Sequence, residues 1–313
     1  MINNMNVSER NIFSRVSVWF LFPILILNIF GLVNLYSATH GPSSTDVQTL
    51  FIQQIVWLVA GWSIFFFVTF LDYLWINKLV WLMYILNVSA LIYTDLHGKV
   101  VLGGQRWIDL HFFRYQPSET MKLALILILA KILVTKNPEG RGMGLRELFL
   151  PLMLVLIPFV LTVKQPDLGT ALTLLLIGGT MLFFVKIRRG IIVFISVIGI
   201  IALPLVWQYG LKDYQKHRVL TFISPDSDPQ GKGYNSIQSR IAVGSGQITG
   251  KGFRQGTQSQ LEFLPERHTD FIFSVLSEEW GFFGSVIVIG IFIWLFLVSF
   301  EISLKARDRN GAL

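Results

Sequence analysis

Apolar residues occur along this chain in long blocks that are separated by short polar connections. The blocks have the length of an α-helix that crosses a hydrocarbon core about 30 Å thick, which is about 20 residues. A helix satisfies its own backbone hydrogen bonds in lipid, so each block is predicted to be a transmembrane helix. We expect about eight such helices, at residues 16–36, 51–70, 79–94, 118–135, 148–163, 167–185, 190–209 and 271–300.

Lysine and arginine residues gather in alternate connections between these blocks. They lie before the first block, near residue 78, at 136–146, at 186–189 and after the eighth block. Because basic residues favour the cytoplasmic side of a membrane, we predict that these connections and both termini are cytoplasmic. The first block is too long for a signal-peptide core, so we interpret it as a retained signal-anchor.

Two connections on the opposite side are long, at residues 95–117 and 210–270. The second contains apolar residues whose pattern predicts a short amphipathic helix near residues 236–243, lying on the membrane surface. The expected fold is an all-α polytopic membrane protein, with one membrane domain over residues 1–313. Residues 210–270 then form a large extracytoplasmic loop between the seventh and eighth helices.

The composition agrees with a membrane protein and removes several classes of function. Hydrophobic residues make up 53% of the chain and charged residues only 14%, whereas a soluble domain carries roughly 25% charged residues. Cysteine is absent, which excludes disulfides and thiolate metal sites. The net charge of +7 comes from basic residues at the ends of helices, so we expect no nucleic-acid partner. Because metal-ligand spacings and hydrolase motifs are missing, we expect no protein-held metal site.

Ionisable residues at the outward ends of the helices are the candidates for chemistry, since a charge in a membrane must pair or line a wet cavity. Asp270 stands where the long loop meets the eighth block, and it either caps that helix or belongs to a site. Glu119 and Lys122 are three residues apart and share a helix face. They are either a first-turn glutamate with a snorkelling lysine or a functional pair.

Three further charged residues allow two interpretations each. Asp167 begins the sixth block, where a helix cap is its simplest role. Arg106 adjoins Trp107 and is either an interfacial anchor or a phosphate ligand. Arg218 is either a solvated charge or a contact for a lipid headgroup.

Four runs of residues, taken together and in order, resemble the SEDS family of proteins (shape, elongation, division and sporulation). Arg267 and the Gln-Leu-Glu-Phe segment before it favour the elongation branch, RodA, over the division branch, FtsW. The runs are Gly-Gly-Gln-Arg-Trp-Ile at 103–108, Gln-Pro-Ser-Glu-x-x-Lys at 116–122, Gln-Pro-Asp-Leu-Gly-Thr at 165–170, and Thr-Gln-Ser-Gln-Leu-Glu-Phe-Leu-Pro-Glu-Arg-His-Thr-Asp-Phe-Ile-Phe at 257–273.

The resemblance implies a bacterial peptidoglycan glycosyltransferase, which uses an undecaprenyl-pyrophosphate-linked donor. Such enzymes join lipid II into glycan strands at the outer face of the cytoplasmic membrane during cell elongation. The resemblance implies that Asp270 is catalytic, and a carboxylate at this boundary can act as the general base. The residues that we expect to bind substrate are Arg106, Glu119, Lys122, Gln165, Asp167, Arg218, Glu266 and Arg267.

The resemblance also implies partners for the chain. A class B penicillin-binding protein would cross-link the strands, and other membrane proteins of the elongation complex would join it. No cofactor is required by this chemistry, although a divalent Mg or Mn ion could bind through the substrate pyrophosphate.

The chain departs from the family pattern at its C-terminal end. RodA-like proteins have about ten spans, and a Pro-rich stretch with Ser-Tyr-Gly-Gly lies near the last two, but no such stretch precedes Leu313. We therefore expect a truncated chain or a short homologue, whose activity as it stands is open. Two alternative functions are a flippase for the lipid-linked precursor, which paired charges at a bundle mouth would also suit, and a non-catalytic scaffold of the elongation machinery.

Overall fold

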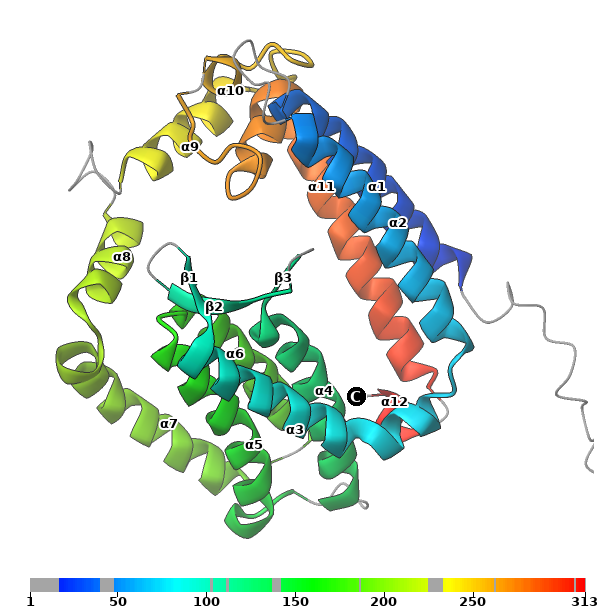
Figure 1. The fold of residues 1–313 in the computed structure, drawn as a ribbon, viewed down its shortest axis with the longest axis vertical. Helices are drawn as coiled ribbons and strands as arrows, with labels where there is room; N and C mark the ends of the chain where they lie inside the picture. The colour runs from blue at the N-terminus through cyan, green and yellow to red at the C-terminus, as the bar shows by residue number, and fades with distance from the viewer. Residues whose placement is uncertain are drawn as a thin grey trace, which may run out of the picture. The chain divides into compact units, whose positions relative to one another are not determined.

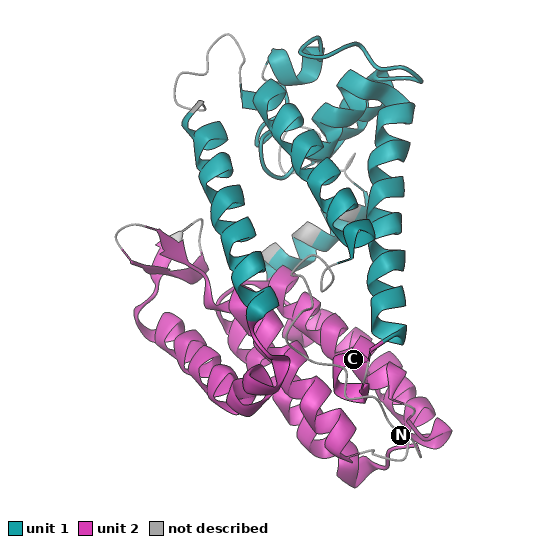
Figure 2. Ribbon diagram, turned by 90° about the vertical axis from the view of Figure 1, so that its right-hand side faces the viewer, with its two compact units in different colours: residues 1–70, 213–305 teal, residues 71–212, 306–313 magenta. Residues whose placement is uncertain are grey.

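The computed structural model describes residues 17–39, 48–101, 104–110, 113–136, 142–185, 187–224, 233–261, 263–306 and 308–312. The described chain is almost entirely helical (Figure 1). It divides into two compact units, coloured separately in Figure 2. Unit 1 contains residues 1–70 and 213–305, and unit 2 contains residues 71–212 and 306–313.

Three long helices form the body of unit 1. They are α1 (Val18–Thr39), α2 (Gln48–Phe70) and α11 (Ile272–Leu304). Helix α1 packs against both α2 and α11, and the three run side by side in Figure 1. Three shorter helices precede α11, and the middle one packs on α11. They are α8 (Asp213–Ile223), α9 (Tyr234–Ser245) and α10 (Thr257–Gln260).

Helix α11 is interrupted at Gly281, where the backbone has φ 65° and ψ −159°. The segment after α9 satisfies the backbone groups that the interruption leaves free. The amide of Phe282 donates to the Gln247 carbonyl at 2.9 Å, and the amide of Gly252 donates to the Glu279 carbonyl at 3.0 Å. A Cβ atom at Gly281 would lie 2.3 Å from the Gly250 nitrogen, so only glycine fits this turn.

Unit 2 is built around α4, which packs against α3, α5 and α6. Apolar side chains of α4, among them Met121, Leu125, Ile128 and Leu133, are buried in the core of this unit. A small antiparallel sheet with strand order β1-β2-β3 connects α3 to α4. The elements are α3 (Tyr73–His97), β1 (Lys99–Val101), β2 (Gly104–Asp109), β3 (Arg114–Tyr115), α4 (Pro117–Lys136), α5 (Leu145–Lys164), α6 (Leu168–Phe184), α7 (Arg189–Leu205), a π-helical turn (Val206–Gly210) and α12 (Arg309–Ala312).

Each of the eight apolar blocks forms a helix, namely α1 to α7 and α11. Among the described residues, six helices are long and apolar enough to cross a membrane: α1, α2, α3, α5, α7 with its π-helical turn, and α11. Helix α6 is apolar but shorter, and α4 carries Glu119, Lys122 and Lys131. The prediction of an all-α polytopic membrane protein is confirmed, while the count of eight spans and the single domain stay predictions.

The outward connections contain more structure than the sequence indicated. The predicted helix near residues 236–243 is confirmed as α9, and its position on a membrane surface stays a prediction. The connection at 95–117 holds the three strands, which the apolar pattern did not indicate.

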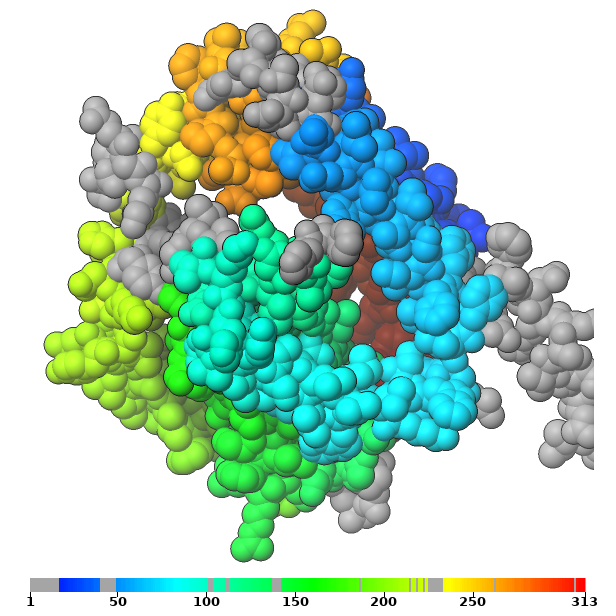
Figure 3. All heavy atoms as spheres, in the orientation of Figure 1, coloured from blue at the N-terminus to red at the C-terminus, as the bar shows by residue number. Residues whose placement is uncertain are grey.

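The exposed surface of α2 is apolar, as expected for a helix that faces lipid. None of the residues in its most apolar window is buried, and side chains such as Ile52, Trp57 and Phe67 are more than half exposed. Figure 3 shows this helix as light-blue spheres on the surface. Contact with acyl chains would remove this area from water, which is why so many large apolar side chains can remain outside the protein core.

Candidate functional site

Asp270 lies in the turn that precedes α11. Its side chain is exposed, and among the described residues it makes no hydrogen bond or ion pair. Phe271 occupies the cap position of α11, and no described side chain caps this helix. The Thr269 hydroxyl, the other candidate cap, donates to the Glu266 carboxylate at 3.1 Å. The capping interpretation of Asp270 is therefore wrong, and its carboxylate is free to act on a substrate.

Residues on both sides of Asp270 are hydrogen-bonded to the C-terminal part of α1. Before Asp270, the Arg267 Nε donates to the Ala38 carbonyl at 3.0 Å. After it, the Asn34 Nδ2 donates to the Ile272 carbonyl at 2.8 Å. The Arg267 hydrogen bond is buried and the Asn34 hydrogen bond is partly buried, and the two side chains are 8% and 5% exposed. The carboxylate of Asp270 thus stands in solvent on a segment whose two ends are held.

Arg267 suits its position for an additional reason. The last carbonyl groups of a helix lack intrahelical partners, and the helix dipole favours a positive charge there. Ala38 is in the last turn of α1, so the guanidinium both satisfies a free carbonyl and meets a favourable field. This contact occupies Nε of Arg267, and the expected role of its guanidinium in substrate binding stays a prediction.

A second tie to α1 involves a buried carboxylate, Glu279, which is 2% exposed. The Ser37 hydroxyl donates to Glu279 Oε1 at 2.5 Å, and the Gln260 side-chain amide donates from Nε2 to the Ser37 carbonyl at 3.3 Å. These bonds join α1, α10 and α11 at the level of the turn that carries Asp270.

The neighbouring Glu278 is completely buried and holds the loop before α11. Its Oε1 accepts from Lys251 Nζ at 2.7 Å, from the Gln258 amide at 3.0 Å and from the Thr257 hydroxyl at 3.2 Å. The sequence pattern did not indicate that Lys251, Glu278 and Glu279 help to build the site. Two adjacent glutamates inside an apolar block were the signal, because a charge in such a block needs a partner.

Of the two other candidates in unit 1, the structure describes the side chain of Glu266 but not that of Arg218. Glu266 is exposed, adopts a positive φ of 50° and lies 3.9 Å from His268 Nε2. Arg218 lies on α8, and its side chain falls outside the described part of the chain. The interpretations of Arg218 stay predictions.

A second set of candidates converges in unit 2, around the turn between α5 and α6. Arg106 on β2 donates from Nε to the Gln165 carbonyl at 3.2 Å and from Nη2 to the Pro166 carbonyl. Its guanidinium lies 3.7 Å from the Asp167 carboxylate. Asp167 accepts from the Thr170 amide, so its predicted role as a helix cap is confirmed. The turn thus holds Arg106 directly, and its two interpretations, as an interfacial anchor or as a phosphate ligand, stay predictions.

The remaining candidates in unit 2 are Gln165, which belongs to this turn, and Glu119 and Lys122, which lie in the first turns of α4. Gln165 is buried, and its side-chain amide donates to the Leu91 carbonyl at 2.8 Å. Glu119 and Lys122 form the expected pair on one face of α4, with Lys122 Nζ 2.8 Å from Glu119 Oε2. Glu119 is the more exposed partner, so this is a solvent-reachable pair at the start of a helix and not a fully buried one.

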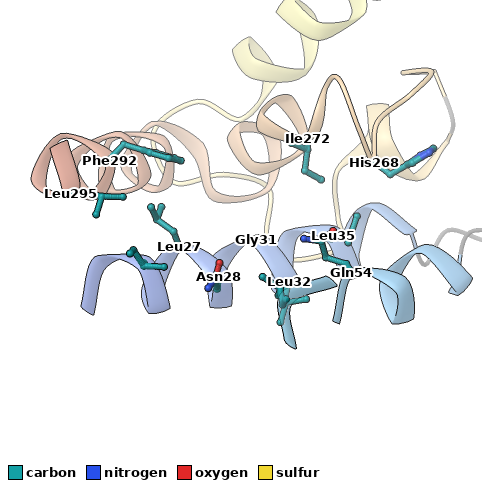
Figure 4. Close-up of a pocket in the computed structure, with 12 residues that line it drawn as sticks. Leu27, Asn28, Gly31, Leu32, Leu35, Gln54, His268, Ile272, Phe292 and Leu295 are labelled. Carbon is teal, nitrogen blue, oxygen red and sulfur yellow. The ribbon is translucent and has the colours of Figure 1, made fainter. Parts of the chain in front are cut away.

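A groove of about 430 Å³ runs along α1 in unit 1 (Figure 4). His268 and Gln54 lie toward one end of it, and the apolar side chains of Phe292 and Leu295 lie toward the other. The polar end therefore adjoins the turn that carries Asp270. A groove of this character suits an amphipathic molecule with a long apolar chain.

Residues 18–313 match the family model of FtsW, RodA and SpoVE, which is described as a cell cycle protein family. The chain belongs to this family. Because RodA and FtsW are SEDS proteins, the predicted membership of the SEDS family is confirmed.

Individual SEDS relatives agree with this assignment. The chain is 41% identical to the peptidoglycan glycosyltransferase MrdB of Escherichia coli strain K12, over 73% of this chain and 61% of that relative. It is 32% identical to the peptidoglycan glycosyltransferase RodA of Treponema pallidum strain Nichols, over 94% of this chain and 83% of that relative. The predicted similarity to RodA is confirmed, and the match covers less than two thirds of MrdB.

A solved structure shares the SEDS fold of this chain. It belongs to a study of the structural coordination of polymerization and crosslinking by a peptidoglycan synthase complex. The two chains superpose with a TM-score of 0.76 at 29% identity, over 94% of this chain and 80% of that chain. The arrangement of helices described above is therefore shared with a peptidoglycan synthase component.

Proposed function

We propose that this protein is a peptidoglycan glycosyltransferase that polymerises lipid II, with Asp270 as the general base. The observation that carries the proposal is the state of Asp270: its carboxylate is exposed and does not cap α11, while residues on both sides of it are hydrogen-bonded to α1. The names of the relatives support the reaction class, since MrdB and RodA are both named peptidoglycan glycosyltransferases.

The chemistry needs a base and a positive environment for the leaving group. The acceptor hydroxyl gives its proton to the Asp270 carboxylate while its oxygen bonds to the anomeric carbon of the donor. The bond from that carbon to the pyrophosphate oxygen breaks, and the lipid pyrophosphate leaves. The guanidinium of Arg267, three residues before Asp270 on the same segment, offers N–H donors for this anion. A Mg or Mn ion held by the pyrophosphate itself could add positive charge.

The groove along α1 supports a lipid-linked substrate. Most of the side chains that line it are apolar, as a site for a polyprenyl chain requires, and its polar end at His268 adjoins the segment that carries Asp270. A chain in the groove would confine the sugar to the membrane surface near the base. Such confinement reduces the entropy lost when the two sugars meet.

The test is lipid II polymerisation by purified wild type and Asp270→Asn. We expect the variant to lose about 100-fold or more in rate with an unchanged unfolding temperature, since the carboxylate makes no hydrogen bond or ion pair with the residues that the structure describes. Asp213→Asn, an exposed aspartate at the start of α8, is the matched control and should keep wild-type activity. Full activity of Asp270→Asn would remove the proposal.

The same proteins separate the two alternative functions. Translocation of the lipid-linked precursor without polymer would indicate the flippase. Identical behaviour of wild type and Asp270→Asn in cells that depend on this gene would indicate a scaffold.

We also propose the cellular setting. The protein spans the bacterial cytoplasmic membrane several times with both termini in the cytoplasm, as the distribution of basic residues supports. It works with a class B penicillin-binding protein and other membrane proteins of the elongation complex. The likeness to a component of a peptidoglycan synthase complex supports this partnership. Co-purification of the two proteins from detergent-solubilised membranes tests it.

A further inference from the structure

A pocket of about 380 Å³ lies in unit 2, where α3 begins and α4 ends. None of the candidate residues for glycosyl transfer lines it. Its volume falls in the range of sites for small ligands. The lining residues are Asp72, Leu74, Trp75, Asn77, Lys78 and Lys131.

Two ammonium groups face this pocket from neighbouring helices. Lys131 Nζ donates to the Asn77 carbonyl at 2.7 Å, which leaves two of its three N–H donors for another partner. Lys78 Nζ lies 4.5 Å from the centre of the Trp75 ring. Neither lysine forms an ion pair with a carboxylate in the described part of the chain. Among the described residues, neither ammonium group therefore has a carboxylate within ion-pair distance.

The pocket also offers acceptors. The Asn77 Oδ1 is buried and has no hydrogen-bond partner among the residues that the structure describes. The Asp72 carboxylate caps α3 by accepting from the Leu74 amide at 3.0 Å. Two lysines and one aspartate leave a net charge of +1, which one phosphodiester would neutralise.

The depth of the two lysines matches that of a lipid headgroup. Lys78 is five residues after the first residue of α3, and Lys131 is five residues before the last residue of α4. At 1.5 Å per residue, each lies about 7.5 Å along the axis from its helix end. Both ends belong to connections that we expect on the cytoplasmic side, and the exposed Trp75 is a typical residue of the membrane interface.

We propose that this pocket binds the headgroup of an anionic phospholipid whose phosphodiester carries free hydroxyl groups, as phosphatidylglycerol does. The phosphate lies between Lys78 and Lys131, and a headgroup hydroxyl donates to Asn77 Oδ1. Basic pockets between transmembrane helices on the cytoplasmic side are suited to such lipids. A bound lipid would hold the start of α3 to the end of α4 independently of the glycosyl transfer proposed above.

Native mass spectrometry of the purified full chain tests the proposal, with phosphatidylglycerol, phosphatidylethanolamine and phosphatidylcholine in equal amounts. We expect preferential retention of phosphatidylglycerol by the wild type. Each lysine near an anionic lipid is worth on the order of 5-fold in affinity, so Lys78→Gln with Lys131→Gln should weaken retention about 30-fold. Lys78→Arg with Lys131→Arg should keep it.

The control is Lys305→Gln at the end of α11, where the lysine is exposed and already paired with Glu301; retention should stay unchanged. If Lys131→Gln unfolds the protein, Lys78→Gln alone still tests the site, because among the described residues the Lys78 ammonium is in contact with a ring on its own helix and with no other helix. Equal retention of the three lipids, or equal retention by wild type and variants, would overturn the proposal. Displacement of the lipid by millimolar inorganic phosphate would also overturn it, because the site would then bind a soluble anion.

Discussion

Replacing Asn34 by leucine should separate the activity of this protein from its stability. The Asn34 side chain makes one hydrogen bond, from Nδ2 to the Ile272 carbonyl at 2.8 Å, and it joins positions 238 residues apart. Its Oδ1 is buried with no partner among the described residues. Leucine has nearly the same shape as asparagine, so the substitution removes the hydrogen bond to Ile272 and also removes the buried oxygen that lacks a partner.

The two contributions to stability are similar in size and opposite in sign. An interhelical hydrogen bond in a membrane protein contributes about 0.6 kcal/mol on average and about 1.7 at most. Removing a buried oxygen without a partner returns about 1 to 3 kcal/mol. We therefore expect Asn34→Leu to keep the free energy of unfolding within about 1 kcal/mol of wild type, or to raise it slightly.

Activity should respond differently, because the lost bond is one of the two that hold the Asp270 segment. A displacement of a catalytic group by about 1 Å can lower a rate about 100-fold. We expect kcat for lipid II polymerisation to fall on the order of 10- to 100-fold, with little change in KM, since the groove keeps its lining. A continuous polymerisation assay and thermal unfolding in the same detergent measure both quantities.

A control separates this effect from a general loss of polar groups in the helices. Ser63→Ala removes a hydroxyl on α2 that bonds only to the Val59 carbonyl of its own helix, and it should leave the rate unchanged. Wild-type kcat in Asn34→Leu at unchanged stability would refute the claim that this bond positions Asp270. A loss of more than about 2 kcal/mol in the free energy of unfolding would refute the expectation that the lost hydrogen bond and the removed buried oxygen nearly cancel.

Two further predictions concern stability. Lys251→Met leaves the fully buried Glu278 without its ion-pair partner, so we expect the free energy of unfolding, measured by chemical denaturation, to fall by about 3 to 5 kcal/mol. The double variant Lys251→Met, Glu278→Gln should recover part of this loss, and a double variant no more stable than the single one would count against the ion pair. Gly281→Ala places a Cβ atom 2.3 Å from the Gly250 nitrogen at a positive φ, so we expect a loss of at least about 1 to 3 kcal/mol. Gly290→Ala, with open space around it on the same helix, should be neutral or stabilising, and equal unfolding temperatures for the two alanine variants would contradict the strain at Gly281.

Much of the candidate site could be recognised from the sequence, but the roles of its residues could not. The sequence placed Asp167 at the start of a helix, and capping followed from local geometry within four residues. It allowed Asp270 the same role, yet there α11 begins with Phe271 at the cap. Two aspartates before apolar blocks look alike in sequence, and the tertiary contacts of the preceding turn decide which one caps its helix.

The sequence by itself determined where the long helices lie, because the thickness of a bilayer sets the length of an apolar block and backbone hydrogen bonding requires a helix there. Only the tertiary structure decided how charges and polar groups are used. Arg267 reaches the end of α1, Lys251 meets Glu278, and Arg106 meets the turn before α6. These contacts join segments that are distant along the chain, and a local pattern of apolar and polar residues carries no information about which distant carbonyl or carboxylate will lie within hydrogen-bond distance of a donor.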